Sequence, residues 1–136
     1  MIFSLTDVTV ALSRALDLME IDFLGGVTYH SRRVAYIALR LAELCGYSTD
    51  ELSDLISLAI LHDNGFGKEF QSRVARDPAA SPVGEFSAVE SSVLHCLAGE
   101  ENLEGYPFLS KPVGVLRCHH ENWDGTGYPQ GLRGEE

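Results

Sequence analysis

The amino-acid sequence predicts an all-α fold, and two observations carry this prediction. Apolar residues recur at three- and four-residue steps over most of the chain, which is the spacing of one helix face. No segment shows the sustained alternation of apolar and polar residues that is typical of a half-buried strand. The 136 residues fit one domain with a sizeable core, and no internal boundary indicates a second.

Two helices are predicted in the first third of the chain. The apolar steps over residues 6–23 predict an amphipathic helix, and Gly25-Gly26 end it. A second helix is expected from about residue 27 to residue 45, with Gly46 as its stop signal. Its apolar stripe consists of Val34, Ile37, Leu41 and Leu44.

A capping box predicts the start of a third helix. Ser48 has the N-cap position and Glu51 the N3 position, so that each side chain can bond to the other's backbone. The helix is expected to reach His62-Asp63, and its predicted buried face consists of Leu52, Leu55, Ile56, Ala59 and Ile60. Over residues 64–86 the pattern dissolves into a loop or short helices rich in glycine and proline.

Two more helices are predicted before the end of the chain. Ser87 and Glu90 form a second capping box, which opens a helix with an apolar face. Pro112 suits the first position of a last helix, which would reach His119-His120. A loop rich in glycine and proline follows the histidine pair.

Composition limits the classes of function. The net charge of −10 argues against non-specific nucleic-acid binding, although bound metal ions would allow contact with a phosphate ester. The three cysteines, Cys45, Cys96 and Cys118, lack CxxC spacing and indicate reduced thiols. No apolar run is long enough to span a bilayer and the N-terminus does not resemble a secretory signal, so a cytoplasmic location is expected.

His62-Asp63 is the first candidate metal-binding pair. It follows a strongly apolar helix, where an imidazole and a carboxylate would be poorly solvated. A divalent metal would satisfy both side chains. The alternative is a His–Asp hydrogen bond that caps the helix.

The other histidines also stand beside polar or small residues. His119-His120 could bind two metals, with Glu121 orienting a ligand, or could be two solvated surface residues. His30 and Arg33 share one helix face, which suits a metal beside a phosphate, although a surface arginine and an incidental histidine are the simpler interpretation. His95 precedes Gly99 by four residues, and this glycine would permit close approach.

Taken together, these motifs resemble the HD-GYP domain, a branch of the HD phosphohydrolase superfamily. The matching run continues beyond the histidine pair as Asp124-Gly125-x-Gly127-Tyr128-Pro129-x-Gly131-Leu132, and all five histidines fall on motif positions. The resemblance covers residues 25–136, and residues 1–24 would form a leading helix. It implies an HD-domain helical bundle with a metal centre in its core.

The resemblance further implies a phosphodiesterase that hydrolyses cyclic di-GMP by means of a metal-activated hydroxide. Asp63 would be catalytic, and two divalent ions, iron or manganese, would be expected. Partners would be cyclic di-GMP or a related cyclic dinucleotide. The loop of residues 124–132, which contains Gly127-Tyr128-Pro129 and is called the GYP loop below, would also bind GGDEF-type or other signalling proteins. The implied metal ligands are His30, His62, Asp63, His95, His119 and His120, and Glu121 would orient a ligand. The implied substrate contacts are Arg33, Lys68, Asp124, Gly127, Tyr128 and Pro129.

Three departures from the family pattern keep other hypotheses open. The family commonly has Ile-Gly-Lys after the HD pair, whereas this chain has Asn64-Gly65-Phe66, and its nearest lysine is Lys68. Gly26 replaces a carboxylate of members with three metals, which favours two ions. A further aspartate ligand of the family is expected beyond Glu136. The alternatives are a degenerate module that binds cyclic di-GMP or a partner, and a phosphohydrolase of another nucleotide.

Overall fold

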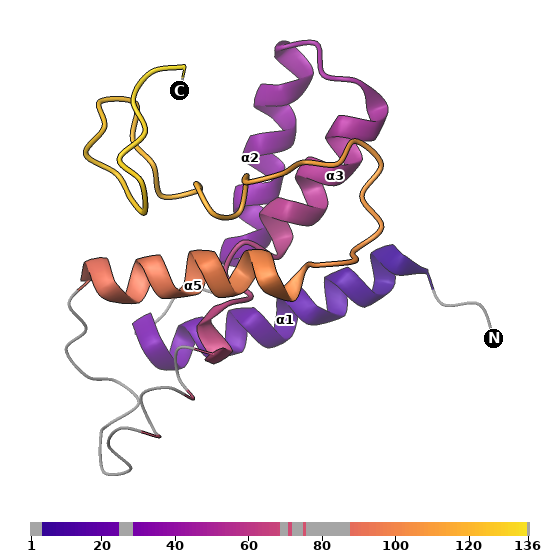
Figure 1. The fold of residues 1–136 in the computed structure, drawn as a ribbon. Helices are drawn as coiled ribbons and strands as arrows, with labels where there is room; N and C mark the ends of the chain where they lie inside the picture. The colour runs from indigo at the N-terminus through magenta and orange to yellow at the C-terminus, as the bar shows by residue number, and fades with distance from the viewer. Residues whose placement is uncertain (1–3, 25–28, 69–70, 72–74, 76–87, 136) are drawn as a thin grey trace. The chain divides into compact units, whose positions relative to one another are not determined.

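The described part of the chain is helical and contains no strand (Figure 1). The structure is a computed structural model that describes residues 4–24, 29–68, 71, 75 and 88–135. Its helices are α1 (Leu5–Leu24), α2 (His30–Leu44), α3 (Thr49–Ile60) and α5 (Ala88–Asn102). The all-α prediction is therefore confirmed. None of the described helices is long and apolar enough to cross a membrane.

The chain divides into two compact units. The first comprises the residues up to Leu61 together with Pro107–Pro112, and the second comprises His62–Tyr106 together with Val113–Glu136. The division falls between the last residue of the α3 cap and the HD pair, where the sequence pattern showed no boundary.

In the first unit, α2 packs against α3. The buried residues of α2 are Ser31, Ala35 and Ala42, whereas the predicted apolar stripe is mostly exposed, with Leu44 85% accessible. In α3 the buried residues are Asp54, Leu58, Ala59 and Ile60, and the predicted Leu52, Leu55 and Ile56 are only half-buried.

Helix α1 buries a polar stripe rather than its apolar one. Thr9, Ser13 and Asp17, four residues apart, are buried, whereas Val8 and Leu12 are exposed. The hydroxyl groups of Thr9 and Ser13 donate to carbonyl oxygens of their own helix, which removes the cost of burying an unpaired donor. The predicted helix is confirmed, but its apolar periodicity does not identify the buried face among the residues with described side chains.

One of the two predicted capping boxes lies in the described part of the chain. The box at Ser48 is confirmed, since the backbone N–H of Ser48 donates to the Glu51 carboxylate and the N–H of Glu51 donates to the Ser48 hydroxyl. The predicted box at Ser87 lies outside the described residues. Of the region 64–86, the structure describes only residues 64–68, 71 and 75, and residues 66–68 are helical.

The last predicted helix is wrong. Residues 115–120 form turns, and the backbone angle φ is +55° at Lys111 and +79° at Gly114. A right-handed helix cannot pass through these left-handed conformations, so the signal of Pro112 as a first helical residue is overridden. The histidine pair therefore lies in a turn, where consecutive side chains are not held to helical spacing.

Asp54 fastens the Pro107–Pro112 segment to α3 inside the first unit. Its carboxylate accepts from the backbone N–H of Leu109 (3.0 Å), and from the N–H and hydroxyl of Ser110 (both 2.6 Å). Burial opposes ionisation of this carboxyl, but the three hydrogen bonds outweigh it and lower its pKa.

Replacing Asp54 with alanine should destabilise the protein by about 2–3 kcal/mol at neutral pH, because the backbone N–H groups of Leu109 and Ser110 lose a charged acceptor. Urea denaturation measures the difference. Since the folded pKa is lowered, the stabilisation is present above the unfolded pKa of about 3.9 and is lost as the pH falls through the folded value. Ser53→Ala, on the exposed side of α3, is the control, and equal effects of both changes at neutral pH would contradict the role of Asp54.

Candidate metal centre

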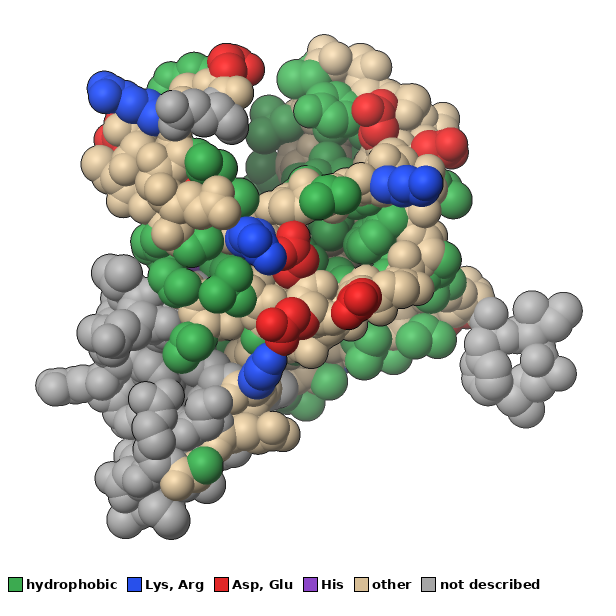
Figure 2. Space-filling model, viewed as in Figure 1, with side chains coloured by type: hydrophobic (Ala, Val, Ile, Leu, Met, Phe, Trp, Pro, Cys, Tyr) green, Lys and Arg blue, Asp and Glu red, His purple; other side chains and the backbone are tan. Residues whose placement is uncertain are grey.

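Helix α5 contributes the most deeply buried histidine. His95 is 2% exposed, and its ring stacks on Phe66 with centroids 4.4 Å apart and planes 17° apart. Phe66 follows the HD pair, so this stacking fixes the His95 ring from the HD side of the second unit. The exposed surface of α5 carries charged side chains. Ion pairs join Lys68 to Glu101 and Arg117 to Glu100, and Figure 2 shows oppositely charged neighbours over the helix.

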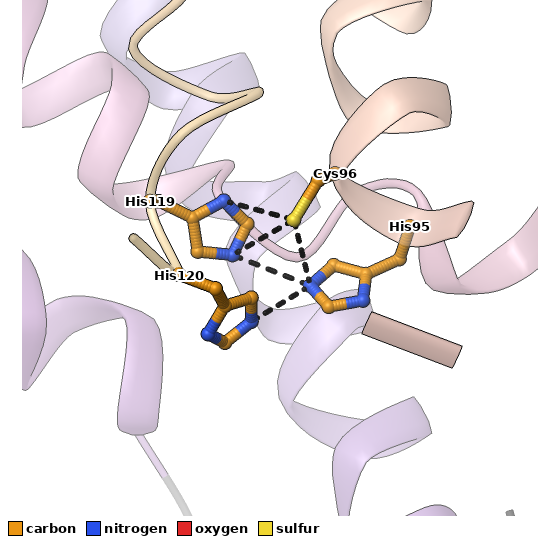
Figure 3. Close-up of side chains that lie close together, drawn as sticks. All are labelled: His95, Cys96, His119 and His120. Carbon is orange, nitrogen blue, oxygen red and sulfur yellow. Dashed lines mark hydrogen bonds between the residues drawn. The ribbon is translucent and has the colours of Figure 1, made fainter. Parts of the chain in front are cut away.

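The turn that ends at the histidine pair directs two more imidazoles toward His95 (Figure 3). The Nε2 atom of His95 lies 3.2 Å from Nε2 of His119 and 3.1 Å from Nε2 of His120. The Nδ1 atom of His119 donates to the carbonyl oxygen of Leu116 at 2.6 Å. In a neutral ring this leaves the lone pair of His119 on Nε2, the atom that lies next to Nε2 of His95.

The HD pair adds a buried carboxylate to the same group. One oxygen of Asp63 lies 2.9 Å from Nε2 of His62. The other lies 3.5 Å from Nε2 of His95 and 3.9 Å from Nε2 of His119. Because α3 ends at Ile60 and residues 62–65 form a turn, both side chains of the pair are available to this cluster.

The donor atoms fit a divalent metal ion. Two ligand atoms about 2.1 Å from one ion are about 3.0 Å apart at a right angle and about 3.4 Å apart at the tetrahedral angle. The separations of 3.1–3.5 Å around His95 Nε2 match this range. Since Nε2 of His95 carries at most one proton, it can donate to only one of the two nitrogens and the carboxylate that it faces.

Burial prepares the site for a cation. Desolvation lowers the pKa of His119 and of His120, so both imidazoles tend to stay neutral and retain a lone pair. Burial opposes ionisation of Asp63, but the hydrogen bond from His62 and the nearby imidazoles outweigh it and lower its pKa. Neutral imidazoles beside a carboxylate are ligands that suit zinc, iron and manganese.

Glu121 fastens the GYP loop directly behind the histidine pair. Its carboxylate accepts from three backbone N–H groups, those of Gln130 (2.6 Å), Gly131 (3.1 Å) and Leu132 (3.0 Å). The N–H of Tyr128 donates to the carbonyl oxygen of His120 (3.2 Å). The loop is therefore folded back onto the residues that supply the imidazoles.

Side chains of the loop contact one another and His120. The Tyr128 ring lies 5.0 Å from the His120 ring, between centroids. Asp124 accepts from the backbone N–H and the hydroxyl of Thr126, and the peptide bond before Pro129 is cis. A Cβ at Gly127 would lie 2.5 Å or less from backbone atoms of His120, Glu121 and Asn122, so this position accepts only glycine.

Asn64 and Gly65 join the turn of residues 62–65, called the HD turn below, to α5. The amide of Asn64 donates to the carbonyl oxygen of Gly99, and Asn102 donates to the Asn64 side chain at 2.8 Å. A Cβ at Gly65 would lie 2.0 Å from the carbonyl oxygen of His95. The departure from the family pattern at Asn64 therefore has a structural consequence, since a polar side chain ties the turn to the helix.

The structure brings together five of the predicted metal ligands, all in the second unit: His62, Asp63, His95, His119 and His120. The sixth, His30, is the half-buried first residue of α2 in the first unit, where Arg33 is exposed. Lys68, a predicted substrate contact, forms an exposed ion pair with Glu101.

The sequence interpretation missed Cys96. This cysteine is fully buried on α5 next to His95, and its sulfur lies 3.7 Å from Nδ1 of His119. Burial, with the negative charge of Asp63 nearby, raises the pKa of its thiol to about 12. The signal in the sequence was the His-Cys dipeptide within a helix that carries a candidate ligand, but adjacency alone does not say where the sulfur points.

Gly65→Ala should prevent the normal fold of the HD turn, because the added methyl group would overlap the backbone of α5. Gly99→Ala on α5 is the matched control, since its Cβ would meet no atom closer than 3.5 Å. Thermal denaturation and near-ultraviolet circular dichroism measure the outcome. A Gly65→Ala protein as stable as Gly99→Ala would refute the close packing.

Glu121→Gln should release part of the GYP loop. The glutamine amide keeps one acceptor oxygen, but its NH2 group replaces the other oxygen and cannot accept a hydrogen bond from a loop N–H. Loss of one charge-assisted hydrogen bond costs about 1.5 kcal/mol, so we expect roughly tenfold faster amide exchange at residues 130–132. Hydrogen exchange followed by NMR measures this. Glu135→Gln is the control, and unchanged exchange in Glu121→Gln would contradict the assigned role.

Sequence comparison identifies the family to which the chain belongs. The sequence profile of the HD domain family matches residues 27–136. The chain is 33% identical over 129 residues to the cyclic di-GMP phosphodiesterase response regulator RpfG of Xanthomonas campestris, covering 91% of this chain and 31% of that protein. It is 32% identical over 110 residues to a cyclic di-GMP phosphodiesterase of Thermotoga maritima, covering 79% and 28%.

A third relative has a different substrate in its name. The chain is 31% identical over 112 residues to the 3'3'-cGAMP-specific phosphodiesterase 2 of Vibrio cholerae, covering 79% of this chain and 20% of that protein. The chain thus spans between a fifth and a third of the length of these relatives. No solved structure is significantly similar to it. The profile match and these relatives are consistent with the HD-GYP branch that the motifs predict, and the chain belongs to the HD domain family.

Proposed function

We propose that this chain is part of a metal-dependent phosphodiesterase that hydrolyses a cyclic dinucleotide, with cyclic di-GMP as the first candidate. The observation that carries the proposal is the convergence of the Asp63 carboxylate and the imidazoles of His119 and His120 on His95 Nε2 at ligand-like separations. The named activities of the relatives support the reaction class.

The proposed roles follow from the positions of the side chains. His95, His119 and His120 hold one side of the metal centre, and Asp63 with His62 holds the other. A bound pair of divalent ions would activate water and neutralise charge on the phosphoryl oxygens. We propose two ions, with iron or manganese as candidates, and retain His30 as a predicted further ligand from its motif position.

Asp63 is the residue to which we assign a catalytic role. Its carboxylate is buried and ionised, and it faces both His62 and His95. It can therefore hold a metal and accept a proton from the attacking water within the same cluster. His62, at 2.9 Å, would keep that carboxylate oriented.

Substrate contacts are proposed on the GYP loop beside the metal ligands. The Tyr128 ring packs near His120 and would form a wall for a base or sugar, with Asp124, Gly127 and Pro129 shaping that wall. Arg33 and Lys68 would bind phosphate, since both carry charges suited to it. Docking of signalling proteins to the same loop remains a sequence prediction.

A degenerate, ligand-binding module is the second candidate function. The observation that favours it is the position of Lys68, which pairs with Glu101, while Asn64 is tied to Gly99 and Asn102. The family lysine that contacts phosphate has no direct counterpart after the HD pair. Such a module would bind a cyclic dinucleotide without hydrolysing it.

The test uses the full-length protein, loaded with Fe²⁺ or Mn²⁺ and offered cyclic di-GMP and 3'3'-cGAMP. We expect linear dinucleotide or mononucleotide products from at least one substrate. Asp63→Asn and His95→Ala should bind much less metal and lower the rate by at least about a hundredfold, because each removes a ligand. Metal analysis and chromatography of the products provide the two measurements.

Asp50→Ala is the matched control, since Asp50 is an exposed acidic residue at the start of α3. It should retain both metal and activity. Tight substrate binding with no product from the metal-loaded full-length protein would favour the binding module. Equal metal content in Asp50→Ala and Asp63→Asn would overturn the assignment of the metal centre.

A further inference from the structure

We propose that Cys96 is a thiolate ligand of the divalent ion held by His95, His119 and His120, and that it favours thiophilic metals at this position. The proposal rests on the metal-dependent part of the proposed function and adds a ligand that the motif of the family does not contain. It concerns four side chains of the second unit, which point toward one another in Figure 3.

The distances from the sulfur support coordination. With about 2.3 Å from metal to sulfur and about 2.1 Å from metal to nitrogen, the tetrahedral angle places sulfur and nitrogen about 3.6 Å apart. The Sγ atom of Cys96 lies 3.9 Å from Nε2 of His95 and 4.0 Å from Nε2 of His119. One donor atom from each of the four residues lies within 4.8 Å of the others. These separations exceed the tetrahedral value, and the sulfur lies nearer Nδ1 of His119 (3.7 Å) than its Nε2, so we expect the Cys96 and His119 side chains to turn toward the ion when it binds.

The burial of the residue supports the same conclusion. Cys96 is 0% exposed and His95 is 2% exposed, so both donors of α5 face the interior. Consecutive helical residues point about 100° apart, which allows two neighbours on α5 to approach one ion from different sides. The other two described cysteines are more accessible, since Cys45 is exposed and Cys118 is half-buried.

A sulfur donor would change which metal the site prefers. On coordination the S–H bond breaks, a sulfur–metal bond forms, and the proton passes to water. Thiolate is a soft ligand that suits Zn²⁺, Co²⁺ and iron, whereas Mn²⁺ and Mg²⁺ prefer carboxylate and water oxygens. We therefore expect the preference of this chain for Zn²⁺ over Mn²⁺ to depend on Cys96.

The first measurement is a Co²⁺ titration of the chain followed by absorption. Coordination by Cys96 gives a near-ultraviolet sulfur-to-cobalt charge-transfer band, which should disappear in Cys96→Ser and Cys96→Ala. The visible d–d bands should remain in both variants, since the three histidines remain. Cys118→Ser is the matched control and should keep the charge-transfer band.

The second measurement is X-ray absorption at the zinc edge, in which wild-type chain should show a sulfur neighbour at about 2.3 Å. In Cys96→Ser this neighbour should be absent, and the affinity ratio of Zn²⁺ to Mn²⁺ should fall at least about tenfold. Far-ultraviolet circular dichroism establishes that each variant is folded.

The outcomes separate this proposal from the proposed function. Cobalt bound through nitrogen and oxygen alone in the wild type, with identical spectra for Cys96→Ser, would overturn the role of Cys96 and leave the histidine–aspartate centre intact. A sulfur band lost only in Cys118→Ser would also overturn it. A folded wild-type chain that binds no cobalt would overturn both the metal centre and this proposal.

Discussion

The convergence of buried donor atoms on the Nε2 atom of His95 is the constraint on which the second unit depends. Two imidazole nitrogens lie within 3.2 Å of this atom, and an Asp63 oxygen lies at 3.5 Å. Burying so many lone pairs together is unfavourable unless a cation or shared protons compensate them. Phe66 and Gly65 hold the HD turn against α5 so closely that the donors cannot separate without disturbing the helix contact.

The same unit uses backbone hydrogen bonds to position the GYP loop. Glu121 follows the histidine pair in the chain, and its carboxylate collects three loop N–H groups. Tyr128 is returned to His120 by a backbone bond and by ring contact. Placing the acceptor next to the metal-ligand candidates couples the shape of the loop to the orientation of their rings, so the loop and the centre form one arrangement.

The helices of the first unit bury polar side chains and also carry exposed apolar ones. Asp54 receives three hydrogen bonds from the Pro107–Pro112 segment, which makes its burial favourable. Thr9 and Ser13 bond to carbonyl oxygens of their own helix, and Asp17 lies 3.4 Å from Arg32. The buried face of α1 among its described side chains is therefore polar, and one Asp17 oxygen on it has no hydrogen-bond partner.

The sequence by itself determined the helical class, the capping box at Ser48 and the family, because periodicity, caps and motif spacing are local properties of the chain. It also gave the five candidate ligands that meet in the second unit. Only the tertiary structure decided that the histidine pair lies in a turn, since the left-handed backbone at Lys111 and Gly114 is not visible in the pattern. The position of the Cys96 sulfur and the buried faces of α1 and α2 were likewise decided by packing between distant segments, which determines where a side chain can be buried and what it meets there.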